Sequence, residues 1–316
     1  MNLVADIGGT TTRLALIRPG HIRKGAELIA LRKFTNDEFP DLKALVTTYL
    51  EACPAPEKVE RGAFCVAAPV LGDSVEMLNR SWQFSVSTLR DELRLTSLKV
   101  VNDFAALAMA LPFLPEDDLL HVGGEKAKPG AAIGVLGPGT GLGVSGLVPH
   151  SSGWSVLHGE GGHVTLPCAT EAEWEILRSL QARFGHVSAE RVLCGAGLAW
   201  LYDAMTKEPL GESPSRLPEA ISGGEDEFSR TVVNQFLAFL GTVAGDLALT
   251  LGAWGGIFLG GGVAHKLAHR YAESPFRERF EAKGRYAAQL ATVPTWLITH
   301  DVPALLGLAA LLDGEI

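Results

Sequence analysis

The chain contains 316 residues, 47% of them hydrophobic, which is enough apolar material for two ordinary domains with one core each. Its formal net charge of -9 and its lack of a Lys/Arg block exclude a nucleic-acid binder that relies on a basic stripe to contact phosphates. The start MNLVADIGG lacks the features of a secretory signal, and the longest apolar runs, such as ALLGLAALL, are shorter than the ~18 residues of a membrane span, so we expect a cytoplasmic protein without a membrane partner.

The first third of the chain alternates strand and helix patterns. Short apolar runs at Leu3–Ile7 and Arg13–Ile17 flank a Gly/Thr turn and predict a β-hairpin. After this hairpin we expect a helix over 41–53, a strand over 62–69, a helix over 87–95, a strand over 97–102 and a helix over 104–113. This alternation predicts a layered α/β domain with parallel strands.

The pattern of strand, Gly/Thr turn and strand occurs a second time, at AAIGVL, GPGTGLG and VSGLV. A shift of about 130 residues lays Gly9 and Thr10 over Gly139 and Thr140, whereas Asp6 falls on a leucine. Two domains of related design are the natural interpretation.

The remaining part of the chain has one long turn-rich stretch, 206–226, which we expect to be a surface excursion. Apolar residues spaced by three or four over 229–251 predict a helix that ends at Gly252. Next, IFLGGG over 257–262 predicts a strand and a glycine turn before a helix. The last strand, 295–299, and the last helix, 303–312, are expected to pack back against the first domain.

The first turn, DIGGTTTR, fits neither common phosphate-binding motif. A Walker loop needs a lysine after its last glycine, and a dinucleotide fingerprint needs GxGxxG at the start of a helix. Glycine amides and threonine hydroxyls can still converge on a phosphate. A carboxylate at Asp6 would then require a divalent cation between it and the phosphate, bound through water if the cation is Mg²⁺. The alternative is an ordinary hairpin with an Asp-initiated turn.

The second turn, Gly137 to Gly143, would be the partner of the first, so that two turns grip a polyphosphate. A third glycine cluster, Gly260 to Gly262, would let a nucleotide base and ribose approach the backbone closely. The alternative for this cluster is a tight connection between strand and helix.

Several polar residues interrupt apolar surroundings. Asn102 and Asp103 stand at the carboxyl end of a predicted strand, where α/β sheets bind ligands, although Asp103 could simply cap the next helix. Glu160 and His163 lie in a glycine-rich loop whose flexibility suits ligand contact. Glu190 falls in the first turn of a predicted helix, where the helix dipole alone would explain a carboxylate.

The four cysteines, Cys53, Cys65, Cys168 and Cys194, are far apart and form no CxxC pair. This pattern is typical of reduced thiols in a cytosolic protein and provides no framework for zinc.

Eight segments, in order along nearly the whole chain, resemble the bacterial glucokinases that lack the zinc-binding ROK signature, within the actin-like ATPase-domain superfamily. These segments are DIGGTTTRLAL, APVLGDSVEMLNRSW, VVNDFAALAMALP, GPGTGLGVS, GEGGHV, GHVSAERVLCGAGL, GGIFLGGGV and HDVPALLG. The resemblance implies two actin-like (ribonuclease H-like) α/β domains with an interdomain cleft, the smaller formed by 1–110 plus about 298–316 and the larger by 111–297. It also implies a homodimer that phosphorylates D-glucose at the 6-hydroxyl with ATP and Mg²⁺.

The resemblance also assigns residues by their positions in the motifs. Asp103 corresponds to the catalytic base, and it would contact the sugar together with Asn102, Glu160, His163 and Glu190. The residues that would hold ATP are Asp6, Gly8, Gly9, Thr10, Thr11, Gly137, Gly139, Thr140, Gly141, Gly260, Gly261 and Gly262. Asp6 would also face the Mg²⁺ through water, and no zinc is expected.

Position 11 departs from the family pattern, which often has Asn where this chain has Thr11, so the role of this residue stays open. Two other functions also stay open. One is a kinase for a related hexose such as mannose or fructose, because a difference of one hydroxyl depends on three-dimensional placement. The other is a non-catalytic sugar-binding regulator, against which Asp103 argues because a binding module needs no base.

Overall fold

The computed structural model describes residues 1–20, 22, 27–53, 58–77 and 81–316, so residues 78–80 of the segment APVLGDSVEMLNRSW lie outside the described part. The chain divides into two compact units, which are considered separately below. The first unit contains Met1–Glu116, His150–His158 and His300–Ile316, and the second contains Asp117–Pro149 and Gly159–Thr299. Residues 150–158 thus fall in the first unit, whereas the sequence analysis places them with the larger domain.

The first unit is built on a five-stranded mixed sheet in the order β3-β2-β1-β4-β7. Its strands are β1 (Asn2–Ile7), β2 (Thr11–Ile17), β3 (Ile29–Thr35), β4 (Arg61–Val66) and β7 (Ser97–Asn102). The strands β1, β2 and β3 pair antiparallel, which confirms the predicted opening hairpin, and β1, β4 and β7 pair parallel, which confirms the predicted pairing. The carboxyl ends of β1, β4 and β7 therefore meet at one edge of the sheet.

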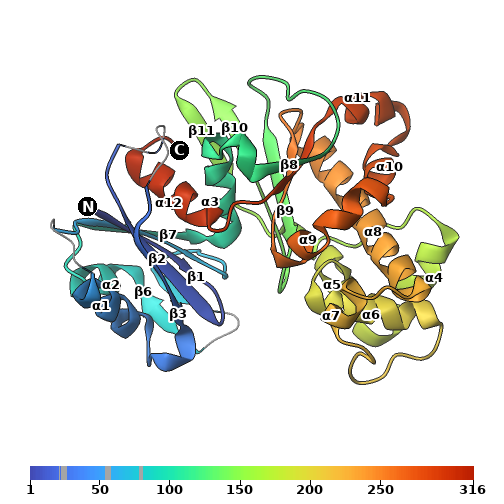
Figure 1. Ribbon diagram of the computed structural model, residues 1–316, viewed down its shortest axis with the longest axis horizontal. Coiled ribbons are helices and arrows are strands. Elements are labelled where there is room, and N and C mark those ends of the chain that lie inside the picture. Colours follow the sequence, from blue (N-terminus) through green and yellow to red (C-terminus); the bar gives the residue numbers. More distant parts are fainter. Residues whose placement is uncertain (21, 23–26, 54–57, 78–80) are drawn as a thin grey trace. The chain divides into compact units, whose positions relative to one another are not determined.

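Helices cover both faces of this sheet (Figure 1). The other elements of the unit are η2 (Asn36–Glu38), α1 (Leu42–Ala52), β5 (Ser74–Glu76), β6 (Gln83–Ser85), α2 (Val86–Glu92), α3 (Asp103–Ala110), η3 (Leu111–Phe113), β11 (Gly153–Leu157) and α12 (Pro303–Asp313). Along β1, Leu3 and Ala5 pack in the cluster that includes α1 and α2, whereas Val4 packs in the cluster with α3 and α12. Successive side chains of a strand point to opposite faces, so Asp6 shares the face of Val4, on the side of α3.

The C-terminal helix α12 belongs to the first unit, as predicted, and it packs closely on α3. Gly307 makes this approach possible, since a Cβ atom there would overlap the carbonyl oxygen of Ala106. Because α3 begins at Asp103, this packing fixes the helix that carries the predicted base. The strand before α12, at 295–298, was expected to pack against the first domain too, but it lies in the second unit because it pairs with strands of that unit.

The second unit contains five strands of a six-stranded sheet, in the order β10-β9-β12-β13-β8. Its strands are β8 (Leu119–Gly123), β9 (Ile133–Pro138), β10 (Leu142–His150), β12 (Ile257–Leu259) and β13 (Thr295–Ile298). Strands β9, β12 and β13 pair parallel, and β10 and β8 pair antiparallel to their neighbours. The carboxyl end of β9 therefore lies beside that of β12, with Leu136 opposite Leu259.

Helices contribute most of the core of the second unit. They are η5 (Gly161–His163), α4 (Glu171–Phe184), α5 (Ala189–Val192), α6 (Gly195–Thr206), α7 (Pro218–Ser222), α8 (Glu227–Leu251), α9 (Gly262–Lys266), η6 (Ala268–Glu273), α10 (Phe276–Glu281), η7 (Gly284–Tyr286) and α11 (Ala287–Thr292). The short 3-10 helix η4 (Glu116–Asp118) spans the boundary between the units. Helix α7 lies in the stretch predicted as a surface excursion.

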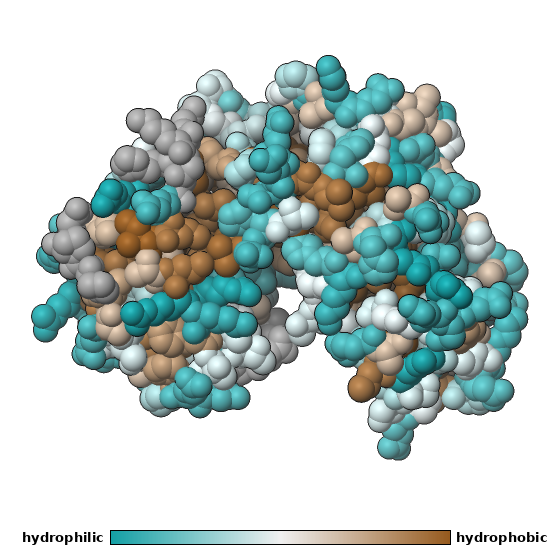
Figure 2. Space-filling model, viewed as in Figure 1, coloured by the Kyte–Doolittle hydropathy of each residue, from teal (hydrophilic) through white to brown (hydrophobic). Residues whose placement is uncertain are grey.

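Helix α8 ends at the predicted residue, because Gly252 adopts the left-handed conformation, with φ 59°. Among the described residues, α8 is the one helix long and apolar enough to span a membrane, with a mean hydropathy of 1.5 over an 18-residue window. This corrects the expectation that no apolar stretch is long enough. The apolar residues of α8 contribute to the core of the second unit, since 72% of that window is buried inside the protein. On the face drawn in Figure 2, hydrophilic residues lie around groups of hydrophobic residues.

The two glycine-threonine turns differ in length by one residue. In the first hairpin Ile7 lies opposite Thr12, which leaves a loop of Gly8 to Thr11. In the second, Pro138 lies opposite Leu142, which leaves Gly139 to Gly141. The predicted repeat is therefore confirmed as two hairpins, but a constant shift of residue number does not align both of their strands.

Candidate active site

The predicted site residues fall into two groups, one in each unit. In the first unit, Asp6 lies near the end of β1, beside Cys65 on β4. Arg13 donates to its Oδ2 atom (3.3 Å) and the Cys65 thiol donates to Oδ1 (3.5 Å). Burial raises the pKa of Asp6 above its usual value, and Arg13 and Cys65 oppose that rise. The carboxylate side chain is still 22% exposed, so it keeps access to a ligand.

The Cys65 thiol lies near enough to both Asp6 and Asp103 for their charges to raise its pKa. The thiol is fully buried, and burial raises its pKa well above the usual value, with further contributions from the charges of Asp6 and Asp103. Both carboxylates are thus near the same thiol, at the edge where β1, β4 and β7 end. A thiol with such a pKa stays protonated and serves as a donor to Asp6.

The N-cap of α3 is Asn102, which corrects the alternative that Asp103 caps this helix. The Oδ1 atom of Asn102 accepts from the amides of Phe104 (2.9 Å) and Ala105 (3.3 Å). Asp103 is the first helical residue, and its Oδ1 atom also accepts from Phe104 (2.9 Å). With its oxygen committed to the cap, Asn102 can offer a sugar hydroxyl only the donor Nδ2, which also contacts the carbonyl oxygen of Ala68 (3.4 Å).

The first turn is fixed by a residue that the sequence analysis did not single out, Asn36. Its side chain donates to the carbonyl oxygens of Gly8 (2.8 Å) and Gly9 (3.3 Å), and it accepts from the hydroxyl of Thr12 (2.7 Å). Thr11, the residue that departs from the family pattern, begins β2 and pairs with β3. The carboxamide at this turn therefore comes from Asn36 and not from position 11.

In the second unit, the second turn and the third glycine cluster lie together. The amide of Gly260 donates to the carbonyl oxygen of Leu136 (3.0 Å), in the strand that leads into the turn. Gly261 has φ 85°, and a Cβ atom there would lie 2.5 Å from the carbonyl oxygen of Pro138. Only glycine allows this approach. The structure thus brings together the two predicted nucleotide-binding segments of this unit.

Glu190 joins the second turn to the predicted sugar residues. As predicted, Glu190 stands in the first turn of α5, and Ser188 is the N-cap of that helix. The Oε2 atom of Glu190 accepts from the amide of Leu142 (2.9 Å), at the end of the turn, and Oε1 lies 3.8 Å from Nε2 of His163. A Cβ atom on Gly141 would overlap Oε2. The Glu190 carboxylate therefore has a specific partner, 48 residues away in the sequence, besides the helix dipole.

The loop with Glu160 and His163 packs on β10, the strand that begins at Leu142. A Cβ atom on Gly161 would lie 2.8 Å from Cγ1 of Val144, and one on Gly162 would overlap the carbonyl oxygen of Leu142. The glycines of this loop therefore allow close packing against β10. The His163 side chain is 61% exposed and available to a ligand.

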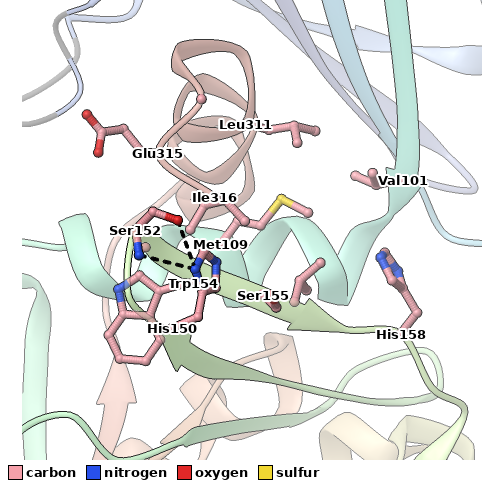
Figure 3. Close-up of a pocket in the computed structure, with 13 residues that line it drawn as sticks. Val101, Met109, His150, Ser152, Trp154, Ser155, His158, Leu311, Glu315 and Ile316 are labelled. Carbon is pink, nitrogen blue, oxygen red and sulfur yellow. Dashed lines mark hydrogen bonds between the residues drawn. The ribbon is translucent and has the colours of Figure 1, made fainter.

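A pocket of about 610 Å³ in the first unit contains none of the predicted site residues. Its walls come from β11, from Val101 and Met109, and from the C-terminal residues, and inside it Ser152 donates to Nδ1 of His150 (Figure 3). The described part of the chain contains no group of three or more His, Cys, Asp or Glu residues able to hold a metal ion.

The Glucokinase family model matches residues 3–315. The glucokinase of Nitrobacter hamburgensis is 45% identical over 315 residues, covering 98% of this chain and 97% of its own, and that of Paramagnetospirillum magneticum is 45% identical over 317 residues with the same coverage. The crystal structure of a glucokinase from an Antarctic psychrotroph aligns with a TM-score of 0.89 at 36% identity, covering 99% of this chain and 98% of its own, and confirms the predicted α/β fold class.

A second solved structure supports the fold alone. The glucokinase of Balamuthia mandrillaris, solved in complex with glucose, has a TM-score of 0.77 at 19% identity and covers 99% of this chain and 93% of its own.

Proposed function

Because the chain belongs to the glucokinase family, we propose that it transfers the γ-phosphoryl group of ATP to the 6-hydroxyl of D-glucose. Family membership makes the protein a hexose phosphotransferase. The main structural support for this site is the position of Glu190. Its carboxylate contacts both the second turn, at Leu142, and His163, which is predicted to bind the sugar.

Asp103 is proposed as the general base. It starts α3 at the edge where three parallel strands end, and its Oδ1 atom is oriented by the amide of Phe104. As the oxygen of the 6-hydroxyl forms its bond to the γ-phosphorus, the bond to the β-phosphate oxygen of ADP breaks, and Asp103 takes the hydroxyl proton. Positioning and electrostatic stabilisation account for most of the acceleration in such reactions.

The sugar ligands are proposed to be Asn102 in the first unit and Glu160, His163 and Glu190 in the second. Glucose hydroxyls both donate and accept, so carboxylates, an imidazole and an amide together match them. The Oε1 atom of Glu190 is the acceptor offered to the sugar, because Oε2 holds the amide of Leu142.

The phosphates of ATP are proposed to contact the two turns, and the adenosine the cluster Gly260 to Gly262. In the first turn, the amides of Gly9 and Thr10 have no protein acceptor within the described ranges, so they can donate to phosphate oxygens. Gly262 has no atom within 4 Å of an added Cβ position, so its surface is open to a ligand.

Asp6 is proposed to face the Mg²⁺ of MgATP through water. Mg²⁺ retains several waters and binds phosphates with one or two carboxylates, and this donor set fits a single partly exposed Asp6. When bound, the ion neutralises charge that develops on the phosphates. Arg13 holds the Asp6 side chain in place through its bond to Oδ2.

The experiment that tests the proposed function is a coupled assay of ADP formation with glucose, mannose and fructose. We expect the highest kcat/KM with glucose. A higher value with mannose or fructose would move the assignment to that sugar, and binding of glucose without turnover would favour the regulator. A homodimer and a cytoplasmic location belong to the same proposal and are tested by sedimentation and by cell fractionation.

A further inference from the structure

Asn36 occupies an unusual position for a polar side chain. It directly follows β3 and is completely buried, as is its partner Thr12. The antiparallel pairing of β2 with β3 continues for one more step here, because the amide of Asn36 donates to the carbonyl oxygen of Thr10 (2.9 Å). This register places the side chain directly behind the first turn.

Every carbonyl oxygen of the turn has a protein donor. Those of Gly8 and Gly9 accept from the Nδ2 atom of Asn36, and that of Thr10 accepts from its backbone amide. The carbonyl oxygen of Thr11 accepts from the amide of Gly8 (3.0 Å). Asn36 thus supplies the donors for three of the four carbonyl groups, all of which would repel a phosphate if they turned outward.

We propose that Asn36 is the positioning residue of the first phosphate turn: it holds the carbonyl oxygens inward so that the amides of Gly9 and Thr10 face the phosphates of the nucleotide. The inference rests on the proposed kinase function, and it adds a residue outside all the motifs that carry the family resemblance. Asn36 acts through the turn, without contacting the nucleotide.

The bonding pattern requires a carboxamide. Nδ2 must face Gly8 and Gly9, because carbonyl oxygens only accept, and Oδ1 must face Thr12, whose hydroxyl can donate. Aspartate has nearly the same shape but, when ionised, has no donor, and it would place a negative charge against two carbonyl oxygens and behind bound phosphates. Asn36→Asp is therefore a nearly isosteric test.

Asn2, on the strand that leads into the first turn, offers a matched control. It is also a buried asparagine, 2% exposed, at the opposite end of β1, and within the described residues its Nδ2 atom has no hydrogen-bond partner. Asn2→Asp makes the same chemical change in a buried site about 20 Å from the turn, at roughly 3.3 Å per strand residue. It reports the general cost of a buried carboxylate.

The experiment measures MgADP affinity by isothermal titration calorimetry, together with kcat and the KM values for ATP and glucose. Urea unfolding checks that each variant is folded. We expect Asn36→Asp to weaken MgADP binding by about 10-fold to 100-fold, since it removes two donors and leaves two carbonyl oxygens without partners. The KM of Asn36→Asp for glucose should change by no more than about twofold. A general loss of structure would instead raise the KM for glucose together with that for ATP.

A milder variant keeps the test valid if Asn36→Asp does not fold. Thr12→Val keeps the shape of the side chain and removes the hydroxyl that orients the carboxamide, so MgADP binding should weaken by about threefold to 10-fold. Asn2→Asp should bind MgADP like the wild type. Folded variants at position 36 or 12 with unchanged MgADP affinity would overturn the proposal, as would an equal loss in Asn2→Asp. A wild-type protein that binds MgADP but phosphorylates no hexose would contradict the kinase function alone.

Discussion

Gly141→Ala tests the link between the second turn and the sugar residues. In the structure, a Cβ atom at position 141 would overlap Oε2 of Glu190 and lie 3.1 Å from its Cδ atom. The glycine has no positive φ, so the backbone itself accepts alanine. The substitution therefore acts on the Glu190 carboxylate, which must retreat by about 1 Å to reach an ordinary van der Waals distance.

The size of the effect follows from this retreat. The carboxylate loses the hydrogen bond that it accepts from the amide of Leu142, which is 2.9 Å long in the wild-type structure. A hydrogen bond to a charged group contributes about 1.5 to 3 kcal/mol. A displacement of about 1 Å at a substrate-positioning group costs roughly 100-fold in rate. Both routes lead to a loss of about 100-fold in kcat/KM for glucose, or about 2.7 kcal/mol. The assay couples ADP formation to a colour change while glucose is varied at saturating ATP.

Two further variants isolate the cause. Gly211→Ala adds a Cβ atom at an ordinary 3.5 Å from the nearest atom, outside the site, and should leave kinetics unchanged. In a Glu190→Ala background, Gly141→Ala should cost no more than about threefold, since the group it displaces is gone. Equal losses with and without Glu190, or a Gly141→Ala enzyme with normal kcat/KM, would show that the substitution does not act through the Glu190 carboxylate.

Asp103→Asn should lower kcat by about 100-fold to 10,000-fold while the glucose affinity, measured by calorimetry, changes little, and near-normal turnover would remove the base assignment. Asp6→Ala should raise the ATP and Mg²⁺ concentrations needed for half-maximal rate more than the KM for glucose; the opposite pattern would count against its role. Gly307→Ala forces α12 away from α3 and should lower the free energy of unfolding by about 1 to 3 kcal/mol or more in urea titrations, so an unchanged midpoint would contradict the packing. Burial acts to raise the pKa of Glu173, but hydrogen bonds, above all from Arg279, outweigh burial and lower the pKa. The ion pair therefore stabilises the fold fully above the unfolded-state pKa of about 4.3. This contribution disappears as the pH falls through the folded-state pKa. The fall of unfolding free energy below pH 4.5 should therefore be less steep in Glu173→Gln than in the wild type, and identical slopes would contradict the sign.

Local patterns predicted the elements that contain buried alternating or helical apolar residues. The hairpin, the parallel strands β4 and β7 and the long helix α8 follow from such patterns. Strand β3 lacks the signal, because four of its seven residues, IALRKFT, are exposed and two of them, Arg32 and Lys33, are charged. It forms by pairing with β2. Its register then carries Asn36 to the first turn, and nothing in FTNDEF indicates that outcome.

The candidate site shows the same limit. The strand-end position of Asp103 was predictable from the pattern of a buried strand followed by a helix, but the cap at Asn102 depends on backbone geometry within one turn. Glu190 has a local explanation in its short helix, and its bond to Leu142 arises only when the chain folds. Contacts between distant segments therefore account for what sequence patterns did not predict.

The most direct test of the account is to identify the product of one turnover. Purified protein, MgATP and D-glucose are mixed, and the products are analysed by phosphorus and proton NMR, with a sample lacking glucose to measure ATP hydrolysis. We predict glucose carrying the phosphate on its 6-oxygen, formed in equal amount with ADP. Phosphate on another hydroxyl, or ADP formed equally without glucose, would contradict it.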